Sequence, residues 1–295
     1  MIDQREAAAV VALLTRAARP AHQYSELVEG AGSALAVLDQ EISQDDCGQT
    51  SLLVPDADRL LDSAAAEIRH WSAAGIETLT VLDPRYPQNL RAVHDRPPLI
   101  FVAGQLESRD QRSIAVIGSR RASAEGKRRA EQIAEHLVHA GFTVISGLAA
   151  GIDTAAHTAA IDNRGRTVAV TGTGLNHAYP PANAELQRRI ATQGAVVSQF
   201  LPDTPPKREN FPARNAVMSG LSLATVIAEA SHTSGARIQA RQALTHGRPV
   251  FVSRPLLGQR WAQELAARPG VYVIDSPAEI TTAIARLHDS DVLIW

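Results

Sequence analysis

Residues 114–130 read IAVIGSRRASAEGKRRA, an apolar run that ends at Gly118 and is followed by five cations among the next residues. A strand, a glycine turn and a basic helix in this order form an anion site, because free backbone N–H groups at a helix N-terminus attract negative charge. The helix should begin near Ser123. We assign Arg120, Arg121 and Lys127 to a phosphate ligand, and we expect residues 128–129 to face solvent.

Two further stretches, SGLAAGID at 146–153 and GTGL at 172–175, also place glycines directly after apolar runs. Glycine lets the backbone approach an anion closely and adopts turn conformations without strain. We therefore expect three loops to converge on one ligand. The second and third loops contribute Ser146, Gly147, Gly151, Gly172 and Gly174. The pattern alone does not say whether the phosphate belongs to a nucleotide or to a nucleic acid.

Several chemistries do not fit these residues. Gly118 and Gly126 are too far apart for an ATP-binding P-loop, and Lys127 is followed by Arg128 where a magnesium-binding Ser or Thr is needed. The segment from Gly172 to His177 lacks the third glycine of a dinucleotide fingerprint. No hydrolase motif is found. We therefore expect a protein that is not an enzyme and that uses no cofactor or metal.

Asp153 and His157 are four residues apart and should share one face of a helix. A metal pair is one interpretation, but no third ligand stands at a suitable spacing. Bracing of the preceding loop is the interpretation that we favour. Tyr179 and Phe211 raise a similar choice, between stacking on bases and packing in the core.

The elements that must position these residues follow a regular rhythm from residue 113 onward. Unbroken apolar runs alternate with helical stretches, which predicts a doubly wound, mainly parallel sheet covered on both faces. The runs are SIAVIG, FTVISG, TVAVTG, AVVSQF, ATVIAEA, PVFVSR and VYVID. Most of them end in glycine or a small polar residue, and these ends should meet at the ligand-binding edge of the sheet.

The 295 residues divide into three predicted parts. Residues 1–70 are rich in Ala and Leu at helical spacing and predict a small all-helical domain. Residues 71–110 form a connector whose two β runs should join the edge of the main sheet, and residues 111–295 form an extended Rossmann-like domain.

The net charge is −2, there is no apolar run long enough for a membrane span, and Cys47 is the single cysteine. We expect a cytoplasmic protein without disulfides.

Seven motifs follow one another along the main domain: GSR at 118–120, SGLAAGID with His157, GTGLNHAYPPAN at 172–183, FPARN at 211–215, SGLS at 219–222, EA at 229–230 and SGARIQAR at 234–241. In this order they resemble the DNA-processing protein A family, also called DprA or Smf. The earlier segment DPRYPQNLRAVHDRPPLIFVAG at 83–104 resembles the lead-in to the main domain of that family.

This resemblance implies a homodimer that binds single-stranded DNA and helps to load RecA recombinase during natural transformation. It implies that the arginine of GSR grips the DNA backbone. By motif, it adds residues to those that the loops supplied, and the full set of expected DNA contacts is Gly118, Ser119, Arg120, Arg121, Lys127, Ser146, Gly147, Gly151, Gly172, Gly174, Asn183, Arg214, Asn215 and Arg241. The alternative is a nucleotide sensor or a phosphoribohydrolase-like relative of the same fold, in which Glu229 or Asp153 contacts a ribose.

The chain departs from the family pattern at three places. Gln199 stands where the family commonly has glutamate, and Gln239 stands where it has threonine. Residues 256–270, LLGQRWAQELAARPG, replace a Gly-x-Asn segment. We also expect no winged-helix module after the main domain. These differences lie near the predicted ligand site and the tail, and they leave the fold prediction unchanged.

Overall fold

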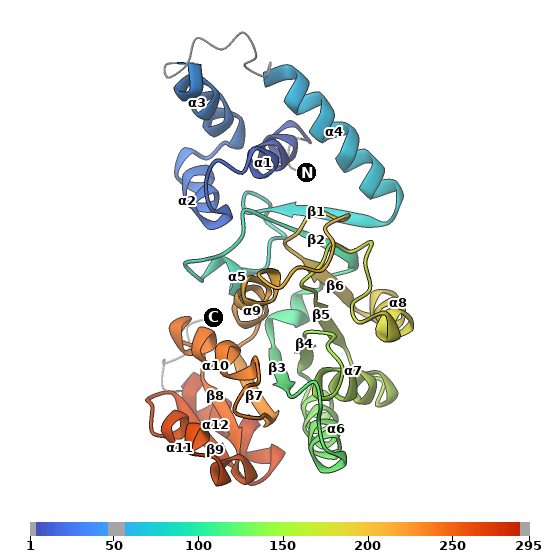
Figure 1. Ribbon diagram of the computed structural model, residues 1–295, viewed down its shortest axis with the longest axis vertical. Helices are drawn as coiled ribbons and strands as arrows, with labels where there is room; N and C mark the ends of the chain where they lie inside the picture. The colour runs from blue at the N-terminus through green and yellow to red at the C-terminus, as the bar shows by residue number, and fades with distance from the viewer. Residues whose placement is uncertain (1–3, 47–56, 290–295) are drawn as a thin grey trace.

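The computed structural model describes residues 4–46 and 57–289, so Cys47 lies outside the described residues. Four helices from the first part of the chain gather at one end of the molecule, above the sheet (Figure 1). They are α1 (Gln4–Arg16), α2 (Ala21–Ala31), α3 (Ala34–Asp46) and α4 (Ala57–Ala73). Helix α1 buries Ala8–Leu13 against its neighbours. Gly75 follows α4 with a φ of 79°, the left-handed conformation in which glycine commonly ends a helix.

The strands of the described chain form one nine-stranded sheet in the order β1-β2-β6-β5-β4-β3-β7-β8-β9. Strands β1 and β2 pair antiparallel with each other and with β6, and all other pairs are parallel. The predicted edge strands and the predicted parallel sheet are both confirmed. The bounds are β1 Ile76–Thr80, β2 Leu99–Gly104, β3 Ser113–Gly118, β4 Thr143–Ser146, β5 Thr167–Val170, β6 Ala195–Ser198, β7 Ala224–Glu229, β8 Val250–Ser253 and β9 Val271–Ile274.

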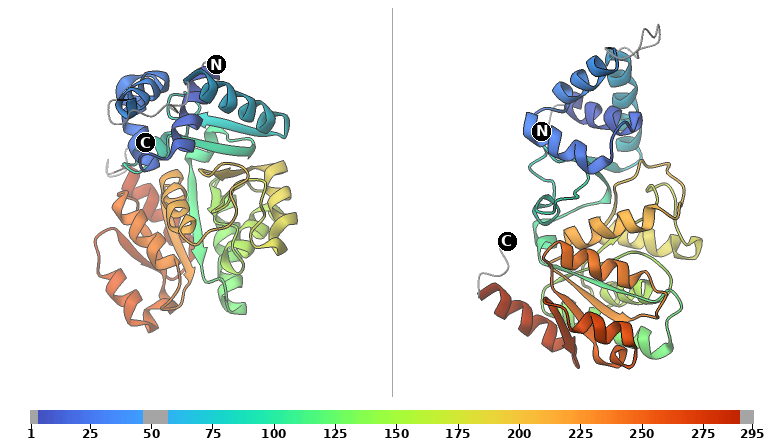
Figure 2. Two further views of the ribbon diagram at one scale, coloured as in Figure 1. Left: turned by 45° about the horizontal axis from the view of Figure 1, so that its top comes forward. Right: turned by 60° about the vertical axis from the view of Figure 1, so that its left-hand side comes forward.

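Helices cover both faces of this sheet, which explains why most positions in its parallel strands are apolar (Figure 2). In β3, Ile114 and Val116 pack with helices α6, α7 and α12, whereas Ala115 and Ile117 belong to the core on the opposite face. The remaining helices are α5 (Gln88–Arg91), α6 (Ala124–His139), α7 (Ile152–Asp162), α8 (Ala184–Gln193), α9 (Asn210–Leu221), α10 (Ala236–Thr245), α11 (Arg260–Ala266) and α12 (Pro277–Asp289), with short 3-10 turns at Ser108–Gln111, Pro181–Asn183 and Arg254–Gly258.

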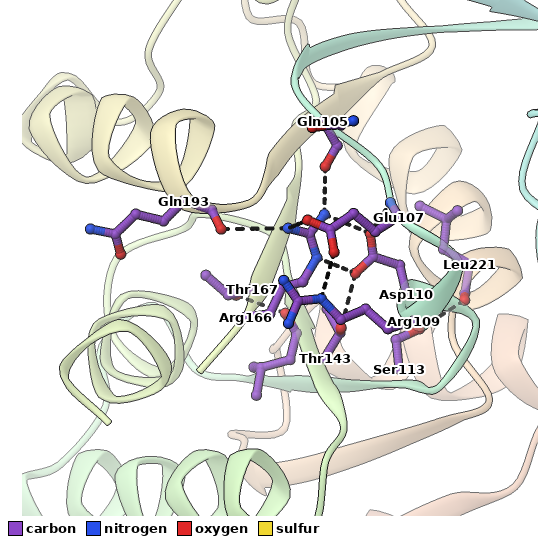
Figure 3. Close-up of polar contacts among 11 residues, drawn as sticks. Gln105, Glu107, Arg109, Asp110, Ser113, Thr143, Arg166, Thr167, Gln193 and Leu221 are labelled. Carbon is purple, nitrogen blue, oxygen red and sulfur yellow. Dashed lines mark hydrogen bonds and ion pairs between the residues drawn. The ribbon is translucent and has the colours of Figure 1, made fainter. Parts of the chain in front are cut away.

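A buried arginine fixes the connection between β2 and β3 (Figure 3). The Nε atom of Arg166 lies 2.6 Å from Asp110 Oδ1, and a terminal nitrogen lies 3.0 Å from Glu107 Oε1. The same guanidinium also donates to the carbonyl oxygen of Gln105. Because Arg166 directly precedes β5, these bonds hold the antiparallel edge strands to the parallel sheet. The domain boundaries at residues 70 and 110 stay predictions.

The order in which strands are added to the sheet reverses between β3 and β7. The chain builds β4, β5 and β6 outward on one side of β3, and then it returns to build β7, β8 and β9 on the other side. The carboxyl ends of the two central strands are Gly118 and Glu229. In doubly wound sheets, ligands bind in the crevice at this reversal. The topology therefore places the GSRR segment at the expected ligand site.

Candidate nucleic-acid interface

The loop after β3 is held mainly by hydrogen bonds to its backbone. The amide of Ser119 donates to the carbonyl oxygen of Glu229 at 2.7 Å, and the Ser119 carbonyl oxygen accepts from the amide of Ile152 at 3.2 Å. The Ser119 Oγ accepts from the amide of Arg121 at 3.1 Å. A Cβ at Gly118 would lie 2.4 Å from the Glu229 carbonyl oxygen and 2.5 Å from Ile152 Cγ1, so only glycine fits there.

Helix α6 begins as the sequence predicted, with Ser123 as its N-cap. The Ser123 Oγ accepts from the amide of Gly126 at 2.9 Å. The carboxylate of Glu229 accepts from the Ser123 amide at 2.8 Å and from the Ser123 hydroxyl. A carboxylate at this position also offsets the positive end of the helix dipole. Glu229 therefore holds the N-terminus of the basic helix α6 beside the loop.

The loop after β4 is braced from within by Asp153, as the sequence predicted. The Asp153 Oδ2 accepts from the amides of Gly147 at 3.2 Å and Ala149 at 3.3 Å. Burial raises the pKa of the Asp153 carboxyl, and the charge of Arg214 opposes this rise. Asp153 thus closes its own loop and has little capacity left for a ligand.

A cleft of about 980 Å³ opens over the carboxyl ends of β3 and β7. Four exposed cations line it, namely Arg120, Arg121, Lys207 and Arg208. Within residues 4–46 and 57–289, none of the four has an ion-pair partner, and the lining includes one carboxylate, which is buried. The cleft therefore has a net positive field, which attracts phosphate groups.

Aromatic rings form one wall of this cleft. The guanidinium carbon of Arg120 lies 4.9 Å from the ring centroid of Phe211, which is the geometry of a cation–π contact. The ring of Tyr179 lies 5.6 Å from that of Phe211 and is 40% exposed. The contact orients Arg120 toward the cleft, and Tyr179 is not a core residue.

Arg214 lies beneath the cleft and is 6% exposed. One of its terminal nitrogens donates to the carbonyl oxygens of Gly147 at 2.6 Å and Val170 at 2.7 Å. These carbonyls end β4 and β5, so the guanidinium ties two strand ends together. Burial lowers the pKa of Arg214, while the charge of Asp153 raises it.

Residues 77–287 match the sequence model of the family described as DNA recombination-mediator protein A, and this match covers more than half of the chain. The chain belongs to this family. Its membership agrees with the resemblance that the motifs indicated.

Curated relatives of the family are similar over the same region. Protein Smf of Synechocystis sp. is 41% identical over 177 residues, covering 59% of this chain and 44% of the relative. The DNA processing protein DprA of Streptococcus pneumoniae is 41% identical over 174 residues, covering 59% and 61%. Protein Smf of Escherichia coli is 37% identical over 239 residues, covering 79% and 64%. The chain thus spans about half to two thirds of the relatives it matches.

Two solved structures share the fold. The X-ray structure of DprA from Streptococcus pneumoniae superposes with a TM-score of 0.73 at 29% identity, covering 95% of this chain and 98% of that one. A structure of DNA processing protein A from Helicobacter pylori has a TM-score of 0.62 at 25% identity, covering 72% and 96%. The Helicobacter pylori protein binds single-stranded DNA in a mode of its own.

The structure brings six of the predicted contact residues of this DprA-family chain to the cleft: Gly118, Ser119, Arg120, Arg121, Arg214 and Asn215. The other eight lie outside its lining. Lys127 and Arg241 are exposed on helices α6 and α10, Ser146 donates to the Val116 carbonyl oxygen, Asn183 donates to the Leu148 carbonyl oxygen, and Gly147, Gly151, Gly172 and Gly174 shape the loops. Their direct contact with DNA stays a prediction.

Sequence reasoning missed Lys207 and Arg208, although two adjacent cations before the FPARN motif are a usable signal. It noticed Gln239 only as a departure from the family. The Gln239 side chain lies at the cleft and is 2% exposed, and neither of its amide atoms has a partner among the residues that the structure describes. A buried amide without partners is costly, so a ligand in the cleft is the natural source of its hydrogen bonds.

His157 is fully buried on α7, behind the cleft. Its Nδ1 lies 2.7 Å from Thr167 Oγ1, and its Nε2 has no partner within the described residues. Burial lowers the pKa of His157 from 6.5 to about 3. The ring is therefore neutral in the folded protein at physiological pH.

We expect this histidine to make the fold sensitive to mild acid. Below pH 6.5 the unfolded chain binds a proton that the folded chain does not bind until pH falls to about 3, so the free energy of unfolding decreases as pH falls through this range. Urea unfolding of the wild type and of His157→Gln at pH 7 and pH 5 measures the effect. The wild type should lose about 2 kcal/mol more than the variant. Equal losses would contradict the assignment.

Proposed function

We propose that the chain binds single-stranded DNA in the cleft at the carboxyl ends of β3 and β7, mainly through the phosphate backbone. The observation that carries this proposal is the exposed guanidinium of Arg120, held against Phe211 at the mouth of a cleft whose exposed cations have no ion-pair partner in the described part of the chain. Guanidinium groups match phosphate oxygens bidentately. Phosphate contacts give affinity without sequence preference, which suits a protein that accepts any strand.

The aromatic wall supports a single strand over a duplex. The exposed ring of Tyr179 offers a face on which an unpaired base can stack, and base stacking contributes about 1–3 kcal/mol per base. Bases in a duplex are already stacked on each other and cannot use this surface. The Helicobacter pylori structure, described by its single-stranded DNA binding mode, is consistent with the same use of this fold.

The alternative of a nucleotide sensor or phosphoribohydrolase has less support. Its two candidate carboxylates are engaged elsewhere, because Glu229 caps α6 and Asp153 accepts from its own loop. We infer a binding protein without catalytic activity. We further propose that the chain assists RecA loading in natural transformation and forms a homodimer, as the resemblance to the family implies, and that it is cytoplasmic. Among residues 4–46 and 57–289, no helix is long and apolar enough to cross a membrane.

A salt titration of DNA binding tests the proposal. Fluorescence anisotropy with a labelled oligo-dT and with a duplex of equal length gives the affinity at several salt concentrations. Single strands release about 0.7 counterion per neutralised phosphate, so contacts to three to five phosphates predict a slope of log K against log salt of roughly −2 to −4. The single strand should bind more tightly than the duplex. A slope near zero, or equal affinity for a mononucleotide, would overturn the proposal.

A further inference from the structure

Three potential metal ligands meet where the connector packs on the Rossmann-like domain. His94 and Asp95 follow α5, and His246 directly follows α10. One ligand atom from each lies within 4.8 Å of the other two. The Nε2 of His246 is 2.7 Å from Asp95 Oδ1. His94 is exposed, while the side chain of His246 is fully buried, so the cluster has one open side toward solvent.

A buried hydroxyl lies against the far nitrogen of His246. Ser219 Oγ is 3.2 Å from the Ala216 carbonyl oxygen, to which it can donate, and 2.8 Å from His246 Nδ1. When Ser219 donates to Ala216, its oxygen accepts from Nδ1–H, and in this tautomer the lone pair of His246 lies on Nε2. A hydrogen bond at the far nitrogen is the usual support of a metal-binding histidine. Ser219 is fully buried, so its hydroxyl supports the ring and is not open to a substrate.

The Nε2 atom of His246 faces the other members of the cluster. The side-chain nitrogen of Gln242 donates to Asp95 Oδ2 at 2.6 Å and lies 3.0 Å from His246 Nε2. The Nε2 atom is 2.7 Å from Asp95 Oδ1. In the tautomer whose lone pair is on Nε2, a cation between this nitrogen and the carboxylate binds both atoms.

We propose that His94, Asp95 and His246 bind a divalent transition-metal ion, with Zn²⁺ as the best match. Two imidazoles and one carboxylate form a known zinc donor set, and water fills the fourth position of the tetrahedron. Bonds of about 2.0–2.2 Å place neighbouring ligand atoms about 3.3–3.5 Å apart. The Nε2 and Oδ1 atoms are 2.7 Å apart and must separate by about 0.6–0.8 Å to bind an ion. The exposed ring of His94 then completes the site from the solvent side.

The ion would act as a clamp between two parts of the fold. His94 and Asp95 belong to the connector that leads to β2, whereas α10 carries Gln239 and Ile238 into the DNA cleft at its other end. Binding of an ion only to the folded state stabilises that state in proportion to the logarithm of ion concentration over dissociation constant. The site therefore couples the stability of this junction to metal supply.

Calorimetric titration of the metal-stripped full chain with ZnCl₂ tests the site, with a matched thermal-unfolding series. We expect one Zn²⁺ per chain and a rise in the unfolding temperature with Zn²⁺. His94→Gln removes an exposed ligand without disturbing the core and should weaken binding by at least about ten-fold, as should Asp95→Asn. Co²⁺ should give the visible absorption bands of a tetrahedral site in the wild type and lose them in His94→Gln.

His139→Gln is the control, since His139 is an exposed histidine at the end of α6, away from the cluster. It should bind Zn²⁺ as the wild type does. If the wild type takes up no Zn²⁺, or if His94→Gln and His139→Gln bind it equally well, the inference is wrong and the three groups form a proton-bridged ion pair. These outcomes are independent of DNA binding, so they do not bear on the proposed function.

Discussion

Arg120→Glu is expected to abolish binding of single-stranded DNA while leaving the unfolding temperature almost unchanged. The side chain is exposed, its one described contact is the stack on Phe211, and no carboxylate within the described residues pairs with it. The substitution removes a charge-assisted phosphate contact of about 1.5–3 kcal/mol and adds repulsion, so affinity for oligo-dT should fall at least about 100-fold. Fluorescence anisotropy and thermal unfolding of the same samples measure both quantities.

Arg128→Glu is the matched control because it makes the same change of net charge on helix α6, which follows the loop that carries Arg120. Arg128 is exposed, pairs with Glu125 one turn earlier, and lies outside the cleft lining. Its reversal should alter affinity only through the long-range field, which salt screens. Equal losses of affinity in the two variants would mean that general charge, and not the cleft, governs binding. Unchanged affinity in Arg120→Glu would show that DNA binds elsewhere.

Much of the fold could be predicted because local patterns and global topology agree. Each of the seven apolar runs after residue 112 is a strand, and the helix after GSRR begins after Ser123. These elements can be recognised from local sequence, because apolar runs mark strands covered on both faces, and glycine turns and capping residues mark where elements end and begin. The position of the cleft also follows, since parallel strands must present their carboxyl ends at one edge.

The finer parts of the site depend on contacts between distant segments, which no local pattern records. Arg214 belongs to a motif that resembles a DNA-contacting sequence. In the structure, however, one terminal nitrogen of its guanidinium donates to two buried carbonyl oxygens. Asp95 and His246 are 151 residues apart, so no spacing rule for metal ligands could join them. The locations of Tyr179 and Phe211 were ambiguous, because the sequence does not distinguish an aromatic residue in a core from one on the wall of a cleft.

Arg214→Met should therefore unfold the protein more readily, and not merely weaken DNA binding. The methionine fills most of the volume but leaves the carbonyls of Gly147 and Val170 without a donor, and it removes the cation near Asp153. Breaking a buried charge network costs about 3–5 kcal/mol, measurable by urea unfolding. Arg208→Met, at an exposed cleft residue, should change stability by less than about 0.5 kcal/mol but reduce affinity. If Arg214→Met keeps wild-type stability and loses DNA binding, Arg214 contacts the strand directly, and its assignment as a tie between β4 and β5 is wrong.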